Sequence, residues 1–207
     1  MARLATVLST RFATLAAGLL LAVTAAAQAL PGQAAPDFRL PDVKGKAIAL
    51  KDFRGRFVVL EWNNPHCPFV KKHYGSGNMQ SLQARYGDEG VAWLAINSTA
   101  VGHEEYTSPS ELATWLTTQK AHPTALLIDS DGAVGHAYSA RTTPQMVVID
   151  PQGVVIYNGA IDDRRSTNPA DVKGAKNYVA AALDEARAGR AVSTPTTTPY
   201  GCSVKYR

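Results

Sequence analysis

Two cysteines are the residues of this 207-residue chain best suited to redox chemistry, and their surroundings differ. Cys67 follows an apolar run that is typical of a buried strand, and it precedes Pro68, a favourable first residue of a helix. A side chain at such a junction lies beside the unpaired N–H groups and the positive dipole end of the helix, which stabilise an anion. Because the thiolate is the reactive form of cysteine, the position predicts a nucleophile at Cys67.

The second cysteine, Cys202, lies near the C-terminus, beyond the Thr/Pro-rich stretch 193–199. That stretch has no apolar pattern able to build a core, so we expect residues 191–207 to form a flexible tail. Such a tail would let the Cys202 thiol reach Cys67. The alternative is a purely structural disulfide, which in the chain-entropy model would stabilise the fold by roughly 5 kcal/mol for a loop of this length.

The elements that position Cys67 are predicted to alternate between strand and helix. Continuous apolar runs at 57–60, 91–96 and 124–128 indicate central strands that are buried on both faces. Ser108 and Glu111 form a capping box that predicts the start of a helix. This alternation predicts an α/β fold in which Cys67 lies at the carboxyl end of a central strand, where reaction sites gather.

Three further patterns complete the predicted fold. Short apolar segments at 38–40 and 47–50 indicate an N-terminal β-hairpin, and segments 145–149 and 154–157 flank a turn that predicts an antiparallel hairpin. Apolar residues spaced from Val172 to Ala186 predict the last helix.

The N-terminal segment, residues 1–29, has the composition of a secretory signal peptide. Basic residues precede a short apolar core, and small residues at 27 and 29 offer a cleavage site after residue 29. We therefore expect a periplasmic or secreted protein that does not remain in the membrane after cleavage. The alternative is that the segment is not cleaved and stays as a membrane anchor. The charges, 21 basic against 17 acidic, form no basic block, so nucleic-acid binding has no support.

The segment 62–74, WNNPHCPFVKKHY, resembles the redoxin branch of the thioredoxin superfamily, to which peroxiredoxins and alkyl hydroperoxide reductases are related. Segments 35–38, 50–55 and 141–144 extend the resemblance over most of the chain after residue 29. It implies a thioredoxin-like fold over residues 30–190, with a central mixed sheet, flanking helices and the N-terminal hairpin as an extension.

The resemblance also implies roles for individual residues. Thr143 and Pro144 match the place where thioredoxin folds set a cis-proline against the reactive cysteine, and with Pro68 they would form the groove for a substrate or partner. Asn64 stands where thioredoxins have the first cysteine of Cys-x-x-Cys, so Cys67 has no resolving thiol inside its own motif.

The first hypothesis for function is therefore an antioxidant peroxidase that resembles peroxiredoxins. Cys67 would be peroxidatic, Cys202 would be the resolving thiol, and an external thiol would act as reductant. Arg141 would hold the thiolate and the peroxide, and Asn64 would donate a hydrogen bond to the thiolate or the substrate. The same two residues also have plain interpretations, Arg141 as an exposed surface charge and Asn64 as a helix cap.

Other functions remain open at this point. The protein could exchange disulfides with partner proteins, or it could be a non-enzymatic module, either copper-binding or held by a structural disulfide. His66 and His73 raise the metal question, but no compact pair of ligands accompanies Cys67, so neither a metal site nor a cofactor is predicted.

Overall fold

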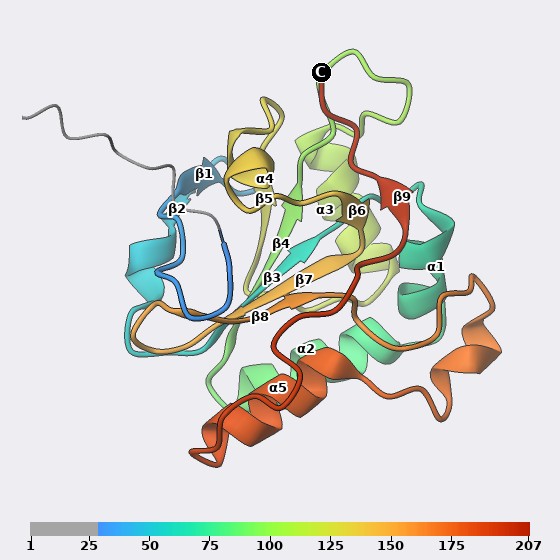
Figure 1. The fold of residues 1–207 in the computed structure, drawn as a ribbon. Helices are drawn as coiled ribbons and strands as arrows, with labels where there is room; N and C mark the ends of the chain where they lie inside the picture. The colour runs from blue at the N-terminus through green and yellow to red at the C-terminus, as the bar shows by residue number, and fades with distance from the viewer. Residues whose placement is uncertain (1–28) are drawn as a thin grey trace, which may run out of the picture.

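The computed structural model describes residues 29–207 (Figure 1). The predicted signal peptide therefore lies outside the described residues, apart from Ala29. Among the described residues, no helix combines the length and the apolar character that crossing a bilayer requires. The elements in chain order are β1 (Arg39–Pro41), β2 (Ala47–Ala49), the 3₁₀ helix η1 (Leu50–Phe53), β3 (Val58–Trp62), α1 (Pro68–Gly75), α2 (Asn78–Asp88), β4 (Ala92–Asn97), α3 (Pro109–Thr118), β5 (Ala125–Ile128), α4 (Ala133–Ala137), β6 (Thr142–Thr143), β7 (Gln145–Ile149), β8 (Val155–Gly159), the 3₁₀ helix η2 (Pro169–Val172), α5 (Tyr178–Arg187) and β9 (Cys202–Ser203).

A five-stranded mixed sheet forms the centre of the molecule, in the order β5-β4-β3-β7-β8. Strands β3, β4 and β5 run parallel, and β7 is antiparallel to both β3 and β8. Every residue of β3 and β4 is buried, as continuous apolar runs require of strands covered on both faces. The predicted α/β class with a central mixed sheet is confirmed.

The two faces of the sheet have different cover. On one face, Trp93 of β4 belongs to an apolar cluster with Tyr86 of α2 and Leu183 of α5, and α1 joins the same layer. On the other face, Leu60 of β3 clusters with Ile48 of the N-terminal hairpin and with Val134 of α4. Figure 1 shows these two layers on opposite sides of β3 and β7.

Both hairpins and the capping box form as predicted. Strand β1 pairs with β2, and β7 pairs with β8, each antiparallel. The Ser108 hydroxyl accepts a hydrogen bond from the Glu111 N–H at 3.4 Å, and the Glu111 carboxylate accepts one from the Ser108 N–H at 2.8 Å.

The predicted start of the last helix is wrong. The helix does not begin near Val172 but at Tyr178, because Gly174 adopts a left-handed conformation with φ +86°. Asn177 then acts as the N-cap, and its side chain accepts a hydrogen bond from the Ala180 N–H at 2.9 Å.

Candidate functional site

Cys67 is the N-cap residue of α1, immediately after the loop that leaves central strand β3. It is buried, with 1 % of its surface exposed, and its Sγ donates a hydrogen bond to the carbonyl oxygen of Thr143 at 2.9 Å. The Thr143–Pro144 peptide bond is cis, and Pro68 occupies the first turn of α1 beside Cys67. The structure thus brings Cys67, Pro68, Thr143 and Pro144 together, as the sequence predicts.

Backbone pairing of the C-terminal segment places Cys202 beside the same loop. Strand β9 pairs antiparallel with β6, and Cys202 stands directly opposite Thr143 in the register. Both thiols are free. Burial first, and then a hydrogen bond with Cys67, raise the pKa of Cys202 to about 12. Cys202 packs against the apolar cluster that contains Cys67.

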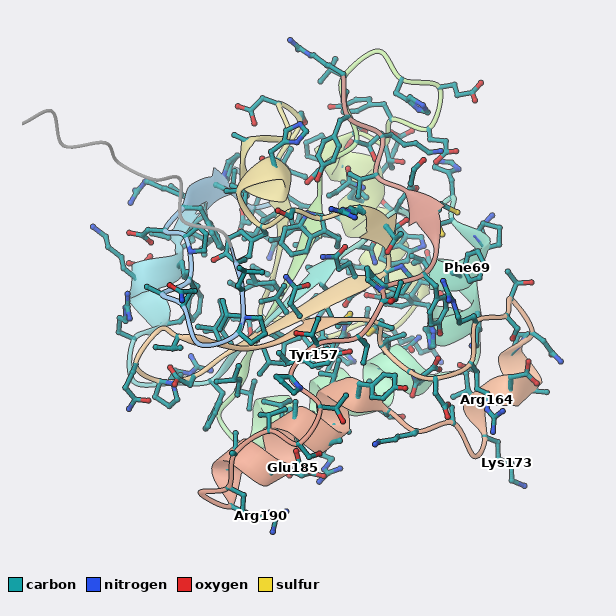
Figure 2. All side chains as sticks on the ribbon, in the orientation of Figure 1. Phe69, Tyr157, Arg164, Lys173, Glu185 and Arg190 are labelled. Carbon is teal, nitrogen blue, oxygen red and sulfur yellow. The ribbon has the colours of Figure 1, made fainter. Side chains whose placement is uncertain are left out.

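The segment 191–207, expected as a flexible tail, lies against the domain along its length. The Thr197 hydroxyl accepts a hydrogen bond from the Ala160 N–H at 2.9 Å and lies 2.6 Å from the hydroxyl of Tyr157, which is labelled in Figure 2. Further along, the Lys205 carbonyl accepts from the Ala100 N–H at 2.9 Å. Hydrogen bonds of threonine and tyrosine side chains thus hold against the domain a segment that has no apolar core pattern. We call residues 195–207 the C-terminal strap.

The peroxidase hypothesis gives Asn64 and Arg141 roles at the thiolate. In the structure, the Asn64 side chain bonds to other residues, and the Arg141 side chain has no partner among the described residues. Asn64 donates from Nδ2 to the Glu105 carboxylate at 2.7 Å and accepts at Oδ1 from the His66 N–H at 2.8 Å. Its side chain thus shapes the loop before Cys67. The Arg141 side chain is exposed and makes no hydrogen bond or ion pair with any described residue, although its backbone pairs with Val204 of the strap.

A buried carboxylate that sequence reasoning missed lies on β3, near the site. Glu61 is fully buried and accepts hydrogen bonds from Asn63 Nδ2 at 2.9 Å, Tyr74 Oη at 2.8 Å and Trp93 Nε1 at 2.7 Å. Burial raises its pKa despite these donors. The sequence signal for this buried carboxylate is a single Glu inside an otherwise apolar strand segment. Glu61 joins β3, β4 and α1 around the loop that carries Cys67.

A second group, which sequence reasoning did not bring together, is an ionisable cluster between α1 and Asp162. Lys72 and His73 are buried beside Asp162, with Lys72 Nζ 3.7 Å and His73 Nε2 3.9 Å from Oδ2 of that carboxylate. Burial lowers the pKa of His73 to about 4, so its ring is neutral at physiological pH. The cluster also contacts the strap, because the Tyr200 hydroxyl donates a hydrogen bond to Asp162.

The histidines near Cys67 form no metal cluster in the described part of the chain. His66 is exposed and its Nε2 lies 3.2 Å from the Thr107 hydroxyl, whereas His73 is buried. No group of three His, Cys, Asp or Glu side chains within residues 29–207 is arranged to hold a metal ion.

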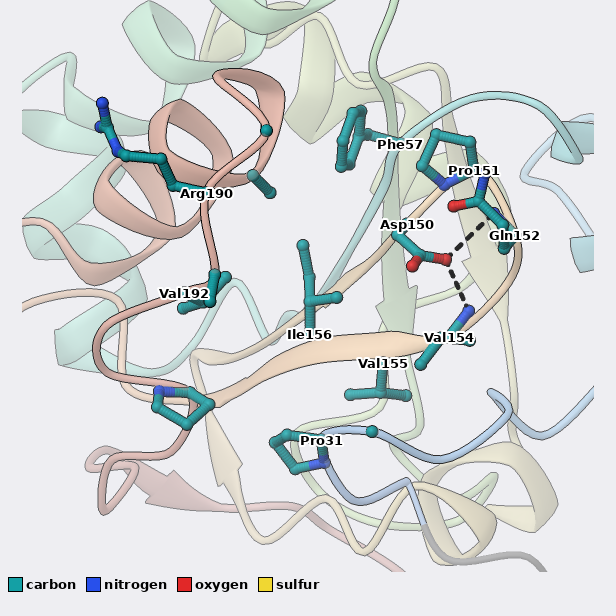
Figure 3. A pocket seen from close by; sticks show the side chains of 15 residues that line it. Pro31, Phe57, Asp150, Pro151, Gln152, Val154, Val155, Ile156, Arg190 and Val192 are labelled. Atoms are coloured by element: carbon teal, nitrogen blue, oxygen red, sulfur yellow. Dashed lines mark hydrogen bonds between the residues drawn. The ribbon is translucent and has the colours of Figure 1, made fainter.

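A cavity of about 610 Å³ lies at the opposite end of β3 from Cys67 (Figure 3). Phe57, Ile156 and Val192 give it an apolar lining. The Asp150 carboxylate at this cavity accepts hydrogen bonds from the N–H groups of Gln152 and Val154 at 3.0 and 2.8 Å, so it serves the β7–β8 turn. The candidate cysteine site lies elsewhere, where β3, α1, β6 and β9 meet.

This geometry, a lone cysteine at the start of a helix against a cis-proline loop, defines the class as thioredoxin-fold redoxins. The model of the AhpC/TSA family matches residues 31–158, and the chain belongs to that family. The matched region ends before the strap, so Cys202 lies outside it.

Sequence relatives include the thiol-disulfide oxidoreductase ResA of Bacillus thuringiensis subsp. konkukian. It is 29% identical over 127 residues, which cover 60% of this chain and 66% of that protein, just under two thirds of its length. The thioredoxin-like protein YneN of Bacillus subtilis is 28% identical over 143 residues, 68% of this chain and 79% of YneN.

Solved structures confirm the thioredoxin-like fold. An uncharacterized conserved protein from Geobacillus kaustophilus superimposes with a TM-score of 0.76 at 29% identity, covering 86% of this chain and 93% of its own. A putative thiol:disulfide interchange protein DsbE from Chlorobium tepidum has a TM-score of 0.52 at 25% identity, covering 62% of this chain and 83% of its own.

Proposed function

We propose that this protein is an exported thiol-disulfide oxidoreductase whose redox pair is Cys67 and Cys202. The observation that carries the proposal is the β6–β9 register, in which Cys202 stands opposite the residue whose carbonyl holds the Cys67 thiol. The names of relatives support the reaction class, since ResA is a thiol-disulfide oxidoreductase and the Chlorobium tepidum protein a putative interchange protein.

In this reaction Cys202 replaces the cysteine that is absent at Asn64. The Cys67 thiolate attacks one sulfur of a partner's disulfide, forming a mixed disulfide and releasing the partner's other sulfur as a thiolate. The Cys202 thiolate then attacks Cys67, forming the Cys67–Cys202 disulfide and releasing the partner's second thiolate. An external thiol reductant returns both cysteines to the dithiol state, and the same steps in reverse oxidise a partner.

The groove for the partner is the edge of β6 beside Pro144 and Pro68. An extended peptide that pairs with Thr142 and Thr143 would form main-chain hydrogen bonds with that edge, as in strand addition. Its sulfur would then lie against Cys67, in the place where the Cys202 thiol lies in the free protein.

The two single-cysteine variants test this proposal with insulin as the disulfide substrate. Cys202→Ser should accumulate a mixed disulfide with insulin through Cys67, visible on a non-reducing gel, because no second thiol resolves it. Cys67→Ser should form none, and the wild type should turn over without accumulation. A mixed disulfide of equal yield through Cys202 in Cys67→Ser would contradict the assignment.

Peroxide reduction is the second function, and membership of the AhpC/TSA family is the observation that favours it. The Cys67 thiolate would attack the O–O bond, forming a sulfenic acid on Cys67 and releasing water or an alcohol. The Cys202 thiol would then condense with the sulfenic acid, giving the disulfide and water. Hydrogen peroxide at one equivalent separates the two functions. Rapid sulfenic acid formation at Cys67 in Cys202→Ser, faster than its reaction with insulin, would favour the peroxidase.

Export is part of the proposal and rests on the sequence of residues 1–29. A periplasmic or secreted location suits a thiol pair that exchanges with partner disulfides, because disulfides persist in those compartments. The mature N-terminus after residue 29, determined by mass spectrometry of the protein from its native host, tests it.

A further inference from the structure

Tyr200, two residues before Cys202, fills a pocket beside Cys67. The side chain is 5 % exposed, and its hydroxyl donates a hydrogen bond to the buried Asp162. Its ring meets the Phe69 ring of α1 edge to face, with centroids 5.7 Å apart. The Lys72 ammonium lies 5.7 Å from the centre of the Tyr200 ring. The pocket thus offers an aromatic wall, a cation and an acceptor to a single phenol.

The strap enters this pocket in a fixed relation to the reactive thiol. Tyr200 contacts Phe69, which is labelled on α1 in Figure 2, and Cys202 packs against the apolar cluster that contains both Cys67 and Tyr200. Between them, Gly201 passes so close to β6 that a Cβ atom there would lie 2.1 Å from the Thr143 carbonyl oxygen. The sequence Tyr-Gly-Cys is thus fitted to the groove at each of its three positions.

We propose that the Tyr200 pocket is a specificity subsite that selects partner strands with an aromatic residue two positions before the reactive cysteine, and that the strap occupies it as an internal ligand. The proposal rests on the proposed function, because a partner's sulfur attacks, or is attacked by, the same Cys67. A partner strand that brings its cysteine to the edge of Thr143 carries its second preceding residue to the pocket.

Partner and strap cannot occupy the edge of β6 together, because β9 already pairs with both residues of that short strand. The strap is covalently attached, so its effective concentration at the groove is in the millimolar range or higher. A partner therefore binds only when the strap leaves, and a partner whose aromatic side chain refills the pocket recovers the contacts that the strap gives up. After the partner has formed a mixed disulfide with Cys67, the return of Cys202 releases it.

The test uses two synthetic peptides, Thr-Pro-Tyr-Gly-Cys-Ser and the same peptide with alanine in place of tyrosine. Each carries thionitrobenzoate on its cysteine as a mixed disulfide. Attack by the Cys67 thiolate on the peptide sulfur releases the coloured thionitrobenzoate anion, which gives the rate. In the double variant Tyr200→Ala, Cys202→Ser, whose pocket is empty, the tyrosine peptide should react at least about tenfold faster than the alanine peptide.

Two comparisons complete the test. With the tyrosine peptide, the Cys202→Ser single variant should react at least about tenfold more slowly than the double variant, because its own Tyr200 holds the pocket. Adding Ser203→Ala to Cys202→Ser is the matched control, since Ser203 is exposed on the same strand, and it should leave the rate within about twofold. The two-peptide comparison in Cys202→Ser alone gives the same ranking and does not depend on the folding of Tyr200→Ala.

Glutathione disulfide separates failure of this inference from failure of the proposed function, because it is small and has no aromatic residue. Equal rates for the two peptides, with normal reaction of Cys67 with glutathione disulfide, would overturn the subsite and leave the redox function intact. If Cys67 reacts with neither glutathione disulfide nor the peptides, the redox function fails, and the subsite fails with it.

Discussion

At the scale of single residues, the proposed chemistry depends on the raised pKa of Cys202. Burial and the hydrogen bond with Cys67 raise the pKa of Cys202 from 9.0 to about 12. Cys202 therefore keeps its proton well above the pH at which an isolated thiol loses it. Once a partner's sulfur blocks Cys67, the contribution of Cys67 to this pKa disappears. In the proposed reaction, Cys202 would then become a better nucleophile for the release of the partner.

We therefore expect the alkylation of Cys202 by iodoacetamide to show an apparent pKa well above 9 in the reduced wild type. In Cys67→Ser the apparent pKa should fall toward 9 but remain above it, because burial, the larger cause, persists. Peptide mass spectrometry across pH 7 to 12 measures both profiles. Equal apparent pKa values in the wild type and in Cys67→Ser would show that Cys67 does not contribute to the raised pKa of Cys202.

The same shift predicts how the stability of the reduced protein changes with pH. The folded state raises the Cys202 pKa, so it binds this proton more tightly than the unfolded chain does. That contribution is fully present below about pH 9 and is lost as the pH rises toward 12. Urea unfolding of reduced wild type and Cys202→Ser at pH 8 and pH 10.5 tests the sign. The wild type should lose more stability than the variant between the two pH values, and an equal or smaller loss would contradict it.

Glu61 gives a further prediction at this scale. Replacement by alanine leaves the buried donors of Asn63, Tyr74 and Trp93 without their acceptor. We expect Glu61→Ala to lower the free energy of unfolding by about 3 kcal/mol or more, measured by urea denaturation. Glu104→Ala, at an exposed position, is the control and should change it by less than about 0.5 kcal/mol. A loss at Glu61 no larger than at the control would show that the network does not stabilise the site.

At the scale of elements, the site depends on one short strand pair, β6 with β9. Each strand has two residues, and the pairing brings together segments about 60 positions apart in the chain. The close approach of Gly201 to the Thr143 carbonyl leaves no room for a side chain at that position. This contact decides whether the strap lies flat on β6.

Gly201→Ala should therefore lift the strap and slow the formation of the Cys67–Cys202 disulfide by at least about tenfold, because the effective concentration of Cys202 falls. The measurement is the rate of disulfide formation after mixing the reduced protein with glutathione disulfide. Gly75→Ala on α1 is the matched control, because its Cβ meets nothing within 4 Å. Equal rates for the two variants would show that the strap tolerates the clash.

At the scale of the whole molecule, the sequence predicts the sheet well and the strap poorly. Apolar runs such as 91–96 and the capping box at Ser108 are local signals, so the central strands, both hairpins and the start of α3 could be predicted. The placement of Cys67 at a helix start beside the cis-proline loop could be predicted because the motif is specific. The strap could not, since its docking depends on hydroxyl groups and a strand edge supplied by distant segments. Asp162 gave no local signal because its partners come from α1 and the C-terminus.

The most direct test of the central claim is the redox titration of the protein in glutathione buffers, followed by mass spectrometry under acid quench. We predict one intramolecular disulfide between Cys67 and Cys202, formed and broken reversibly at a potential above about −300 mV, where labile rather than structural disulfides lie. It should be absent from both Cys67→Ser and Cys202→Ser. Two free thiols in fully oxidised glutathione, or a disulfide that no glutathione buffer reduces, would contradict the assignment of these cysteines as an active redox pair.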